Sequence, residues 1–583
     1  MTRRGPARTA RHLDDERHAL TPEVSDTARA RMLAARKIVT GLSLLIVVAF
    51  GALLLLSLLV PIYTDEIGSK LQLMRILVEG GRLLTLVPQC RSTWAQPIPV
   101  SWYPAAVYYH VFFLPLGLLG HKLSAMLLAT AWFAAVARVV ARTTREPGRR
   151  LRRFAAFVAL HAAGTVPLAI VTARAEPTLV IALGLFVAFP LAWPVESLKT
   201  WWGRALLALG FVLLTSIFFF SSYKTLFFAP LVLLSAVLTF RRRLGLLAPV
   251  AGLVVLAALQ TNNHARRFMG CEEAPIVQAV VQSISLDPRL AVREPATFVK
   301  EGLKNLKGRT VDIADGMAIV APHPWLPPST AENVPRAVTW ADDVSRALLY
   351  GVVIGVPLFT LFVAVRGWRS PRARVPIVLA VTLLACIGGH VWFAHHWNYY
   401  MSPLVICLLA LTSVLASLAL PRPSRRSRRV VLLGAIVLHA MALGVMVTTL
   451  VHVGPKLVAL AKLEGTVLPG QPAYVPALGF GKERTKIREH AARCGIEGDG
   501  ARRLVVDDAT LFAFDDLHEP LHIIYVTDAG MWGHDMPGEK NLAFLRELGP
   551  SGIISRCGFF PTSLESKAKR EGGYCCVSAD ELR

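Results

Sequence analysis

The sequence predicts an α-helical protein that crosses a membrane about eleven times and carries a small extracytoplasmic α/β domain at its C-terminal end. Hydrophobic residues make up 54% of the 583 residues, charged residues only 17%, and the mean hydropathy is +0.49. A soluble globule has no use for that much apolar surface. The apolar residues also form long stretches, separated by short clusters of arginine. Both features are typical of a multi-spanning membrane protein.

Eleven apolar stretches are predicted as membrane spans, because about twenty apolar residues cross a bilayer. The first follows a charged tail, 1–37, and has no small-residue cleavage site after it, so we interpret it as an uncleaved span and not as a signal peptide. The predicted spans are 38–60, 123–141, 154–173, 177–193, 205–221, 225–240, 244–260, 345–365, 375–394, 401–420 and 430–452.

The net charge of +24 reports the topology of these spans. Alternate connections are basic: 142–153 holds six arginines, 241–243 is an arginine triplet, and 366–374 and 422–429 are arginine-rich. Basic loops remain on the cytoplasmic side during insertion. We therefore expect a multi-pass protein of the bacterial cytoplasmic (inner) membrane, with its N-terminus inside and its C-terminus outside. No basic face on a soluble domain favours nucleic-acid binding.

Two long outer loops follow from this topology, 61–122 and 261–344. The first contains another apolar run, 104–120. Counting that run as a span would move every later arginine cluster to the outside, so we expect instead a helix that lies at the membrane surface or dips partly into it. The transmembrane domain is expected over 38–452.

Residues 453–583 have the composition of a soluble domain. Short strand candidates alternate with helical patterns, which predicts an α/β domain with a partly parallel sheet. Six cysteines fall in segments assigned to the outside, where we expect disulfides without being able to read their pairing. The strand candidates are 503–506, 522–526, 552–555 and 574–577, the helix candidates are 541–548 and 561–570, and the outer cysteines are Cys90, Cys271, Cys494, Cys557, Cys575 and Cys576.

Charged and aromatic residues at the outer ends of spans are the candidate functional residues, because charge at that depth is costly unless it is used. Asp65 and Glu66 follow the first span; they suit a general base or a metal-bound phosphate site, or they merely cap the next helix. Arg174 and Glu176 form a tight outer turn, suited to an anionic ligand and a hydroxyl-bearing substrate, or to an internal ion pair.

Three further features lie on the same face. Lys224 either holds a phosphate or extends its ammonium to the interface. His395 and His396 suit a phosphate or a sugar, and Tyr399 and Tyr400 suit a sugar or an interfacial aromatic belt. Together these groups favour a substrate with a lipid tail and an anionic, hydroxyl-rich head.

The order of these motifs resembles that of the GT-C membrane glycosyltransferases, closest in layout to lipid A aminoarabinose transferase and the protein O-mannosyltransferases. Five features are shared. An Asp-Glu pair follows the first span, and a Pro-aromatic run precedes the second. An acidic-Pro pair follows the third span, a lysine lies between the fifth and sixth, and a Tyr-rich turn precedes a Pro-bearing span. The matching positions are Thr64-Asp65-Glu66, Trp102-Tyr103-Pro104, Tyr108-Tyr109, Glu176-Pro177, Lys224, Tyr399-Tyr400 and Pro403.

The resemblance implies inverting transfer of a sugar from a polyprenyl-phosphate donor to a glycan, lipid or protein acceptor at the outer membrane face. It implies Asp65, Glu66 and Glu176 as catalytic residues. Arg174, Lys224, His395 and His396 would bind the donor phosphate, and Trp102, Tyr103, Tyr399 and Tyr400 the substrate. Mg²⁺ or Mn²⁺ is compatible with these carboxylates, but no ligand set requires a metal. Gly68 and Trp102-Tyr103 stand where the aminoarabinose transferase has an arginine and a Glu-Lys pair, so the sugar is not indicated.

Three other functions stay open from the sequence. A flippase of lipid-linked sugars would need polar residues through the middle of the membrane, and these spans have few. A polymerase or ligase of surface polysaccharide would use Arg and His in a late outer loop, where His264, Arg266 and Arg267 stand. A non-catalytic relative would use its outer domain to bind a partner.

Overall fold

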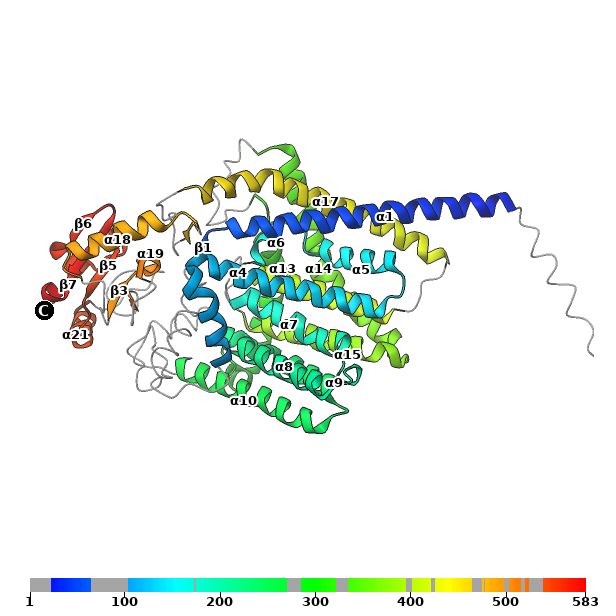
Figure 1. The fold of residues 1–583 in the computed structure, drawn as a ribbon, viewed down its shortest axis with the longest axis horizontal. Coiled ribbons are helices and arrows are strands. Elements are labelled where there is room, and N and C mark those ends of the chain that lie inside the picture. Colours follow the sequence, from blue (N-terminus) through cyan, green and yellow to red (C-terminus); the bar gives the residue numbers. More distant parts are fainter. Residues whose placement is uncertain are drawn as a thin grey trace, which may run out of the picture.

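Helices make up most of the chain and pack side by side in one bundle (Figure 1). The computed structural model describes residues 22–63, 103–171, 175–269, 285–320, 334–394, 401–420, 425–463, 474–476, 478–496, 503–514, 520–523 and 538–582. The helices of the bundle are α1 (Pro22–Leu56), α4 (Tyr103–Thr143), α5 (Pro147–Ala159), α6 (Val166–Ala169), α7 (Ala175–Ala192), α8 (Trp201–Ser221), η6 (Tyr223–Phe228), α9 (Ala229–Phe240), α10 (Leu244–Met269), α13 (Pro295–Asp315), α14 (Arg336–Gly367), α15 (Pro371–Phe393), α16 (Met401–Ala419) and α17 (Arg425–Ala461).

The chain is a multi-pass membrane protein. Within the described ranges, nine helical segments are long and apolar enough to cross a membrane. Two more of the eleven predicted spans correspond to shorter pieces: α7, apolar over Thr178–Ala192, and the α5–α6 pair.

The extent to which each helix is buried is consistent with a bundle surrounded by lipid. The apolar window of α16 is 83% buried, so this helix lies in the centre of the bundle. The windows of α1 and α17, which pack against each other, are only 28% and 22% buried. Their outer faces expose leucine and valine, among them Leu45, Val48, Val430 and Val451. Such a surface is stable against acyl chains and would be unfavourable in water.

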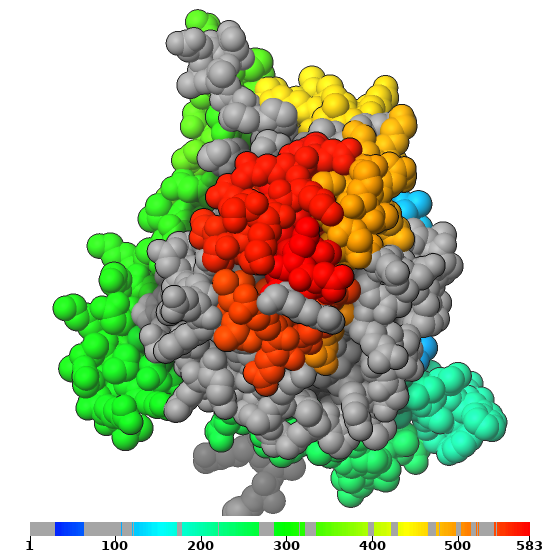
Figure 2. Space-filling model, turned by 90° about the vertical axis from the view of Figure 1, so that its left-hand side faces the viewer, coloured from blue at the N-terminus to red at the C-terminus, as the bar shows by residue number. Residues whose placement is uncertain are grey.

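The two ends of the bundle differ in character (Figure 1). The start of α1 and the arginine-rich connections α4–α5, α9–α10 and α14–α15 lie at one end, here called the basic end. The C-terminal domain lies beyond the opposite end, here called the distal end. Figure 2 views the molecule from the distal end, and the C-terminal domain occupies the middle of that face. This arrangement has the alternation that the positive-inside pattern requires.

The segment predicted as the span 154–173 is not one continuous helix. The helix α5 ends at Ala159 and α6 begins at Val166. At the break, Gly164 adopts φ +55°, a left-handed conformation that favours glycine. Its N–H donates to Ser345 Oγ at 3.0 Å, and the N–H of Thr165 donates to the carbonyl of Met317 at 3.0 Å. Neighbouring segments thus satisfy the backbone groups that the break releases, which membrane-embedded backbone demands.

The apolar run 104–120 is helical, as expected, but it is the first part of α4 and not a separate helix. The part of α4 suited to cross the membrane begins at Lys122. In Figure 1 the first part of α4 runs across the direction of the rest of the helix. The run therefore lies outside the membrane-crossing part of α4.

The C-terminal domain contains a five-stranded mixed sheet in the order β4-β3-β5-β7-β6. As predicted, the sheet is partly parallel: β3 (Leu504–Val506) pairs parallel with β4 (Pro520–His522) and β5 (Gly552–Arg556). The strand β7 (Tyr574–Ser578) is antiparallel to β5 and β6 (Lys569–Glu571). Helices α18 (Gly481–Arg493), α19 (Asp508–Leu511), α21 (Gly538–Leu548) and α22 (Ala579–Leu582) accompany the sheet.

The prediction of one helix over 561–570 was wrong. Residues Thr562–Lys567 form a 3-10 helix, and the chain then enters β6. The turn from β6 to β7 is Gly572-Gly573, with φ +57° and +85°. Two positive φ values are what a two-residue hairpin turn needs, and glycine supplies them without strain. This turn, and not helical periodicity, decides the local structure.

Four of the six outer cysteines form disulfides, as predicted: Cys494 with Cys576, and Cys557 with Cys575. Cys90 and Cys271 lie outside the described residues. Since neighbouring residues of a strand point to opposite faces of a sheet, Cys575 and Cys576 link β7 to different elements on its two sides.

Candidate functional site

Most of the site residues expected from the sequence lie outside the described residues. These are Asp65, Glu66, Trp102, Arg174, His395, His396, Tyr399 and Tyr400. Tyr103 is the first residue of α4 and Glu176 the second of α7. Lys224 lies in η6, between α8 and α9, with its side chain partly buried. The structure therefore describes Lys224 and the elements that lead into the other positions.

Lys224 lies in a tightly turned segment. The side chain of Ser222 caps η6 by accepting from the N–H of Lys224 at 3.3 Å, and Thr225 Oγ1 donates to the carbonyl of Ser222 at 2.6 Å. Thr225 is fully buried. The turn therefore fixes the backbone that carries Lys224.

The segment with Lys224 packs against the end of α15. The ring of Phe227 lies 5.6 Å from that of His390 and 5.4 Å from that of Phe393, between ring centroids. Ala394 follows Phe393, and His395 is the next residue. Two candidate positions that are far apart in the sequence, Lys224 and the histidine pair, are thus carried by elements in direct contact.

The end of α10 joins the same group. The rings of Tyr223 and His264 lie 5.9 Å apart, and Thr261 Oγ1 donates to the carbonyl of Phe219 at 3.2 Å. Arg266, two residues beyond His264 on α10, is exposed. His264 is therefore a neighbour of the Lys224 turn, a relation that the sequence alone did not reveal.

Residues between α10 and α14 hold the end of α15 in place. The N–H of Leu286 donates to the carbonyl of Phe393 at 2.8 Å, and Ser285 forms a β-bridge with Ala394. On α13, Asn305 Nδ2 donates to the carbonyl of Trp392 at 2.8 Å. The chain entering His395 is thus fixed from two sides.

The chain entering Asp65 is fixed by the C-terminal part of the protein. The short strand β1 (Ile62–Tyr63) pairs antiparallel with β2 (Tyr474–Val475), with Ile62 opposite Val475 and Tyr63 opposite Tyr474. Tyr474 is 1% exposed and belongs to the same buried apolar cluster as the bundle. Asp65 comes two residues after Tyr63, so covalent geometry keeps the two Cα atoms within about 7.6 Å.

Asp342 is a buried carboxylate that the sequence analysis missed. It is 6% exposed, and its Oδ1 accepts from the N–H of Ile319 at 2.6 Å. Arg346 donates to Asp342 at 3.2 Å and to Asp315 at 2.7 Å. This network holds the turn after α13, which in turn contacts the break at Gly164. The role of Asp342 is to position the backbone of this turn. The feature of the sequence that could have indicated it is the pair of adjacent carboxylates, Asp342-Asp343, near the start of an apolar stretch.

Lys122 is a second missed residue. Its side chain is fully buried at the start of the membrane-crossing part of α4. A lysine buried so completely requires acceptors or a counter-charge. Its position, a lone lysine at the start of an apolar stretch, is visible in the sequence, where we placed it at the end of the loop 61–122.

The described residues offer one group with the geometry of a metal site, and it lies in the C-terminal domain: His490, Cys494 and Cys576. The carboxylates expected to suit Mg²⁺ or Mn²⁺, Asp65 and Glu66, lie outside the described residues.

No family model and no curated protein sequence matches the chain. Among solved structures, the chain is similar to the archaeal oligosaccharyltransferase AglB from Archaeoglobus fulgidus, solved with an inhibitory peptide and a dolichol-phosphate. The alignment covers 88% of this chain and 69% of that one, with 10% identity and a TM-score of 0.40. A likeness at this level supplies no argument about activity, which must come from the residues themselves.

Proposed function

We propose that the chain is a membrane glycosyltransferase that moves a sugar from a polyprenyl-phosphate donor to an acceptor hydroxyl. The reaction takes place at the distal end, which faces away from the cytoplasm in a bacterial cytoplasmic membrane. The acceptor is a glycan, a lipid or a protein, and membrane lipids surround the bundle. The order of the sequence motifs is the starting point of this proposal.

One observation carries it furthest: the Lys224 turn packs against the end of α15 that leads into His395 and His396. A donor with a phosphate at the membrane surface needs cationic groups from separate elements to converge there. The contact between Phe227 and Phe393 supports that convergence. The same elements are apolar below it, as a lipid tail requires.

In the proposed reaction, Asp65 takes the proton of the acceptor hydroxyl. The acceptor oxygen forms a bond to the anomeric carbon as the bond from that carbon to the phosphate oxygen breaks. A single displacement of this kind inverts the anomeric carbon. The electron pair leaves on the polyprenyl phosphate, where Arg174, Lys224 and the histidine pair stabilise the developing charge. Glu66 and Glu176 orient hydroxyl groups, and Trp102, Tyr103, Tyr399 and Tyr400 contact the sugar.

A second candidate has an observation in its favour. His264 lies beside Tyr223, next to the Lys224 turn, so a late-loop histidine joins the same surface. A polymerase or ligase of surface polysaccharide would use such a residue on a polyprenyl-diphosphate substrate. The two proposals differ in the donor that is consumed.

The test incubates the purified protein with labelled polyprenyl-monophosphate sugars and polyprenyl-diphosphate oligosaccharides, with bacterial membrane extract as the source of acceptor. We expect consumption of the monophosphate donor and release of polyprenyl phosphate. Asp65→Asn should abolish turnover, because loss of a general base costs about 10²–10⁴-fold. Lys224→Met should raise KM and lower kcat.

The matched controls make the same change of charge at exposed residues away from the site. Asp343→Asn removes an exposed carboxylate of α14, and Lys199→Met removes an exposed lysine of the α7–α8 connection. Both should turn over as the unmodified protein does. Near-normal turnover in Asp65→Asn would refute the assigned base, and consumption of only the diphosphate donor would favour the polymerase or ligase.

A further inference from the structure

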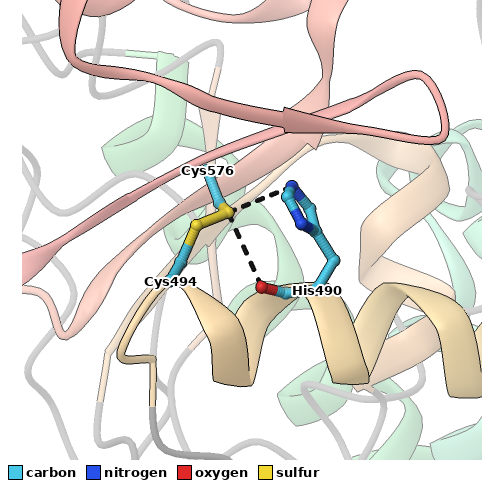
Figure 3. A group of neighbouring side chains, drawn as sticks. All are labelled: His490, Cys494 and Cys576. Atoms are coloured by element: carbon cyan, nitrogen blue, oxygen red, sulfur yellow. Dashed lines mark hydrogen bonds between the residues drawn. A yellow bond between two sulfur atoms is a disulfide. The ribbon is translucent and has the colours of Figure 1, made fainter.

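Three metal-ligating side chains meet in the interior of the C-terminal domain (Figure 3). His490 and Cys494 lie one helical turn apart at the end of α18, and Cys576 faces them from β7. They are 4%, 1% and 0% exposed, and their ligand atoms all lie within 4.8 Å of one another. In the structure the two cysteines are joined as a disulfide. The sequence showed no such group, because Cys576 is distant in the chain.

The imidazole of His490 is oriented by an acidic partner. Its Nδ1 lies 3.2 Å from Glu571 Oε2, which also accepts from Arg493 Nη2 at 2.6 Å and Arg493 Nε at 3.0 Å. A carboxylate beside Nδ1 holds a proton on that nitrogen. Nε2 is then the nitrogen on the side of the two cysteines. Nε2 points at the two sulfurs and lies 3.1 Å from Cys576 Sγ (Figure 3).

The same three atoms can surround a cation. Nε2 faces the sulfurs, and the ligand atoms of His490, Cys494 and Cys576 lie within 4.8 Å of one another. A cation between them would accept electron pairs from the nitrogen and from both sulfurs once the bond between the sulfurs is broken.

We propose that His490, Cys494 and Cys576 form a Zn²⁺ site when the disulfide between the two cysteines is reduced. A dithiol reductant gives up two electrons and two protons and becomes a disulfide itself. The bond between Cys494 and Cys576 breaks, and each sulfur becomes a thiol. Zn²⁺ then binds both sulfurs as two protons leave, and water takes the fourth position.

The distances fit this state. Zn–S bonds of about 2.3 Å and a Zn–N bond of about 2.0 Å, in tetrahedral geometry, place the sulfurs about 3.8 Å apart and the nitrogen about 3.5 Å from each. The sulfurs therefore separate by about 1.8 Å from the bonding distance of a disulfide, which side-chain rotation provides. Thiolate and imidazole are the ligands that Zn²⁺ prefers.

The surroundings fit as well. A histidine that binds a metal through one nitrogen commonly donates its other N–H to a carboxylate, which raises its basicity and fixes its direction. Glu571 occupies that place, and Arg493 holds Glu571. The link between α18 and β7 is then kept in both states, covalent in one and through the metal in the other.

The test uses the full-length protein in detergent, reduced with a phosphine that is afterwards removed under argon. Zn²⁺ is titrated and its stoichiometry measured, with Co²⁺ as a spectroscopic probe of thiolate coordination. We expect one Zn²⁺ per chain at this site after reduction and none in the oxidised protein. His490→Ala should weaken binding more than tenfold, and Glu571→Gln should weaken it about 10–100-fold.

The double variant Cys557→Ser/Cys575→Ser is the matched control, because it removes the other described disulfide and leaves the three ligands. It should keep the affinity of the unmodified protein. Retention of the disulfide in oxidised His490→Ala, by thiol counting, shows that the domain has folded. The proposal is overturned if the reduced protein binds no Zn²⁺, if both His490→Ala and Glu571→Gln bind like the unmodified protein, or if the control variant loses binding.

Discussion

Replacing Gly164 by alanine should destabilise the bundle, because this glycine is needed for two independent reasons. Its φ of +55° lies in the left-handed region. A Cβ built on it would stand 1.7 Å from the carbonyl oxygen of Met317, far inside contact distance. That oxygen accepts from the N–H of Thr165, so it cannot move away without weakening a buried hydrogen bond.

The expected cost follows from these two terms. Left-handed backbone costs a residue with a Cβ about 1–2 kcal/mol. Forcing an extra carbon into a packed interior costs about 1–3 kcal/mol. The smaller conformational freedom of alanine in the unfolded chain returns up to about 1 kcal/mol. With the full return, the sum is a loss of about 1–4 kcal/mol for Gly164→Ala.

A thermal melt followed with a thiol-reactive fluorophore measures this effect, since Cys386 and Cys407 are free and buried in α15 and α16. At about 2–4 °C per kcal/mol, the midpoint should fall by several degrees. Gly388→Ala is the control, because that glycine lies in α15 with open space around its Cβ position. It should hold or raise the midpoint by helix propensity. Equal midpoints for the two variants would refute the reasoning.

Two further predictions concern the C-terminal domain. Tyr474→Ala removes a buried ring and should lower the local free energy of unfolding by about 3–5 kcal/mol. We expect faster proteolysis between α17 and α18 and slower sugar transfer. Leu478→Ala, at a residue that is 62% exposed, is the control and should change neither. The pKa of Glu581 is lowered from 4.5, mainly because its carboxylate accepts from the N–H of Ser578. The ionised form is thus favoured in the fold, so its stabilisation is present above pH 4.5 and is lost as the pH falls through the lowered pKa. Glu581→Gln should flatten this dependence, measured by hydrogen exchange of 569–582; an unchanged pH profile would contradict it.

How far the sequence could predict the site depends on the kind of residue. Lys224 could be identified because a lone cation at the end of an apolar stretch is visible in the sequence. His264 was named only for another function, because its closeness to Tyr223 depends on how α10 packs against η6. Asp342 was missed because its partners, the N–H groups of Ile319 and Val320, belong to a different segment.

The group of His490, Cys494 and Cys576 also could not be predicted from the sequence. His490 and Cys494 share a helix face, which spacing can suggest. Cys576 reaches them only because β7 lies beside α18.

The sequence by itself determined that the chain is a multi-pass membrane protein, where most spans lie, and which connections are basic, because hydrophobicity and charge act locally along the chain. It also determined the partly parallel sheet of the C-terminal domain. Only the tertiary structure decided that the span 154–173 breaks at Gly164, because the groups that stabilise the break, Met317 and Ser345, come from distant segments. Likewise, only packing brought β2 against β1, so that the C-terminal segment fixes the chain that enters Asp65.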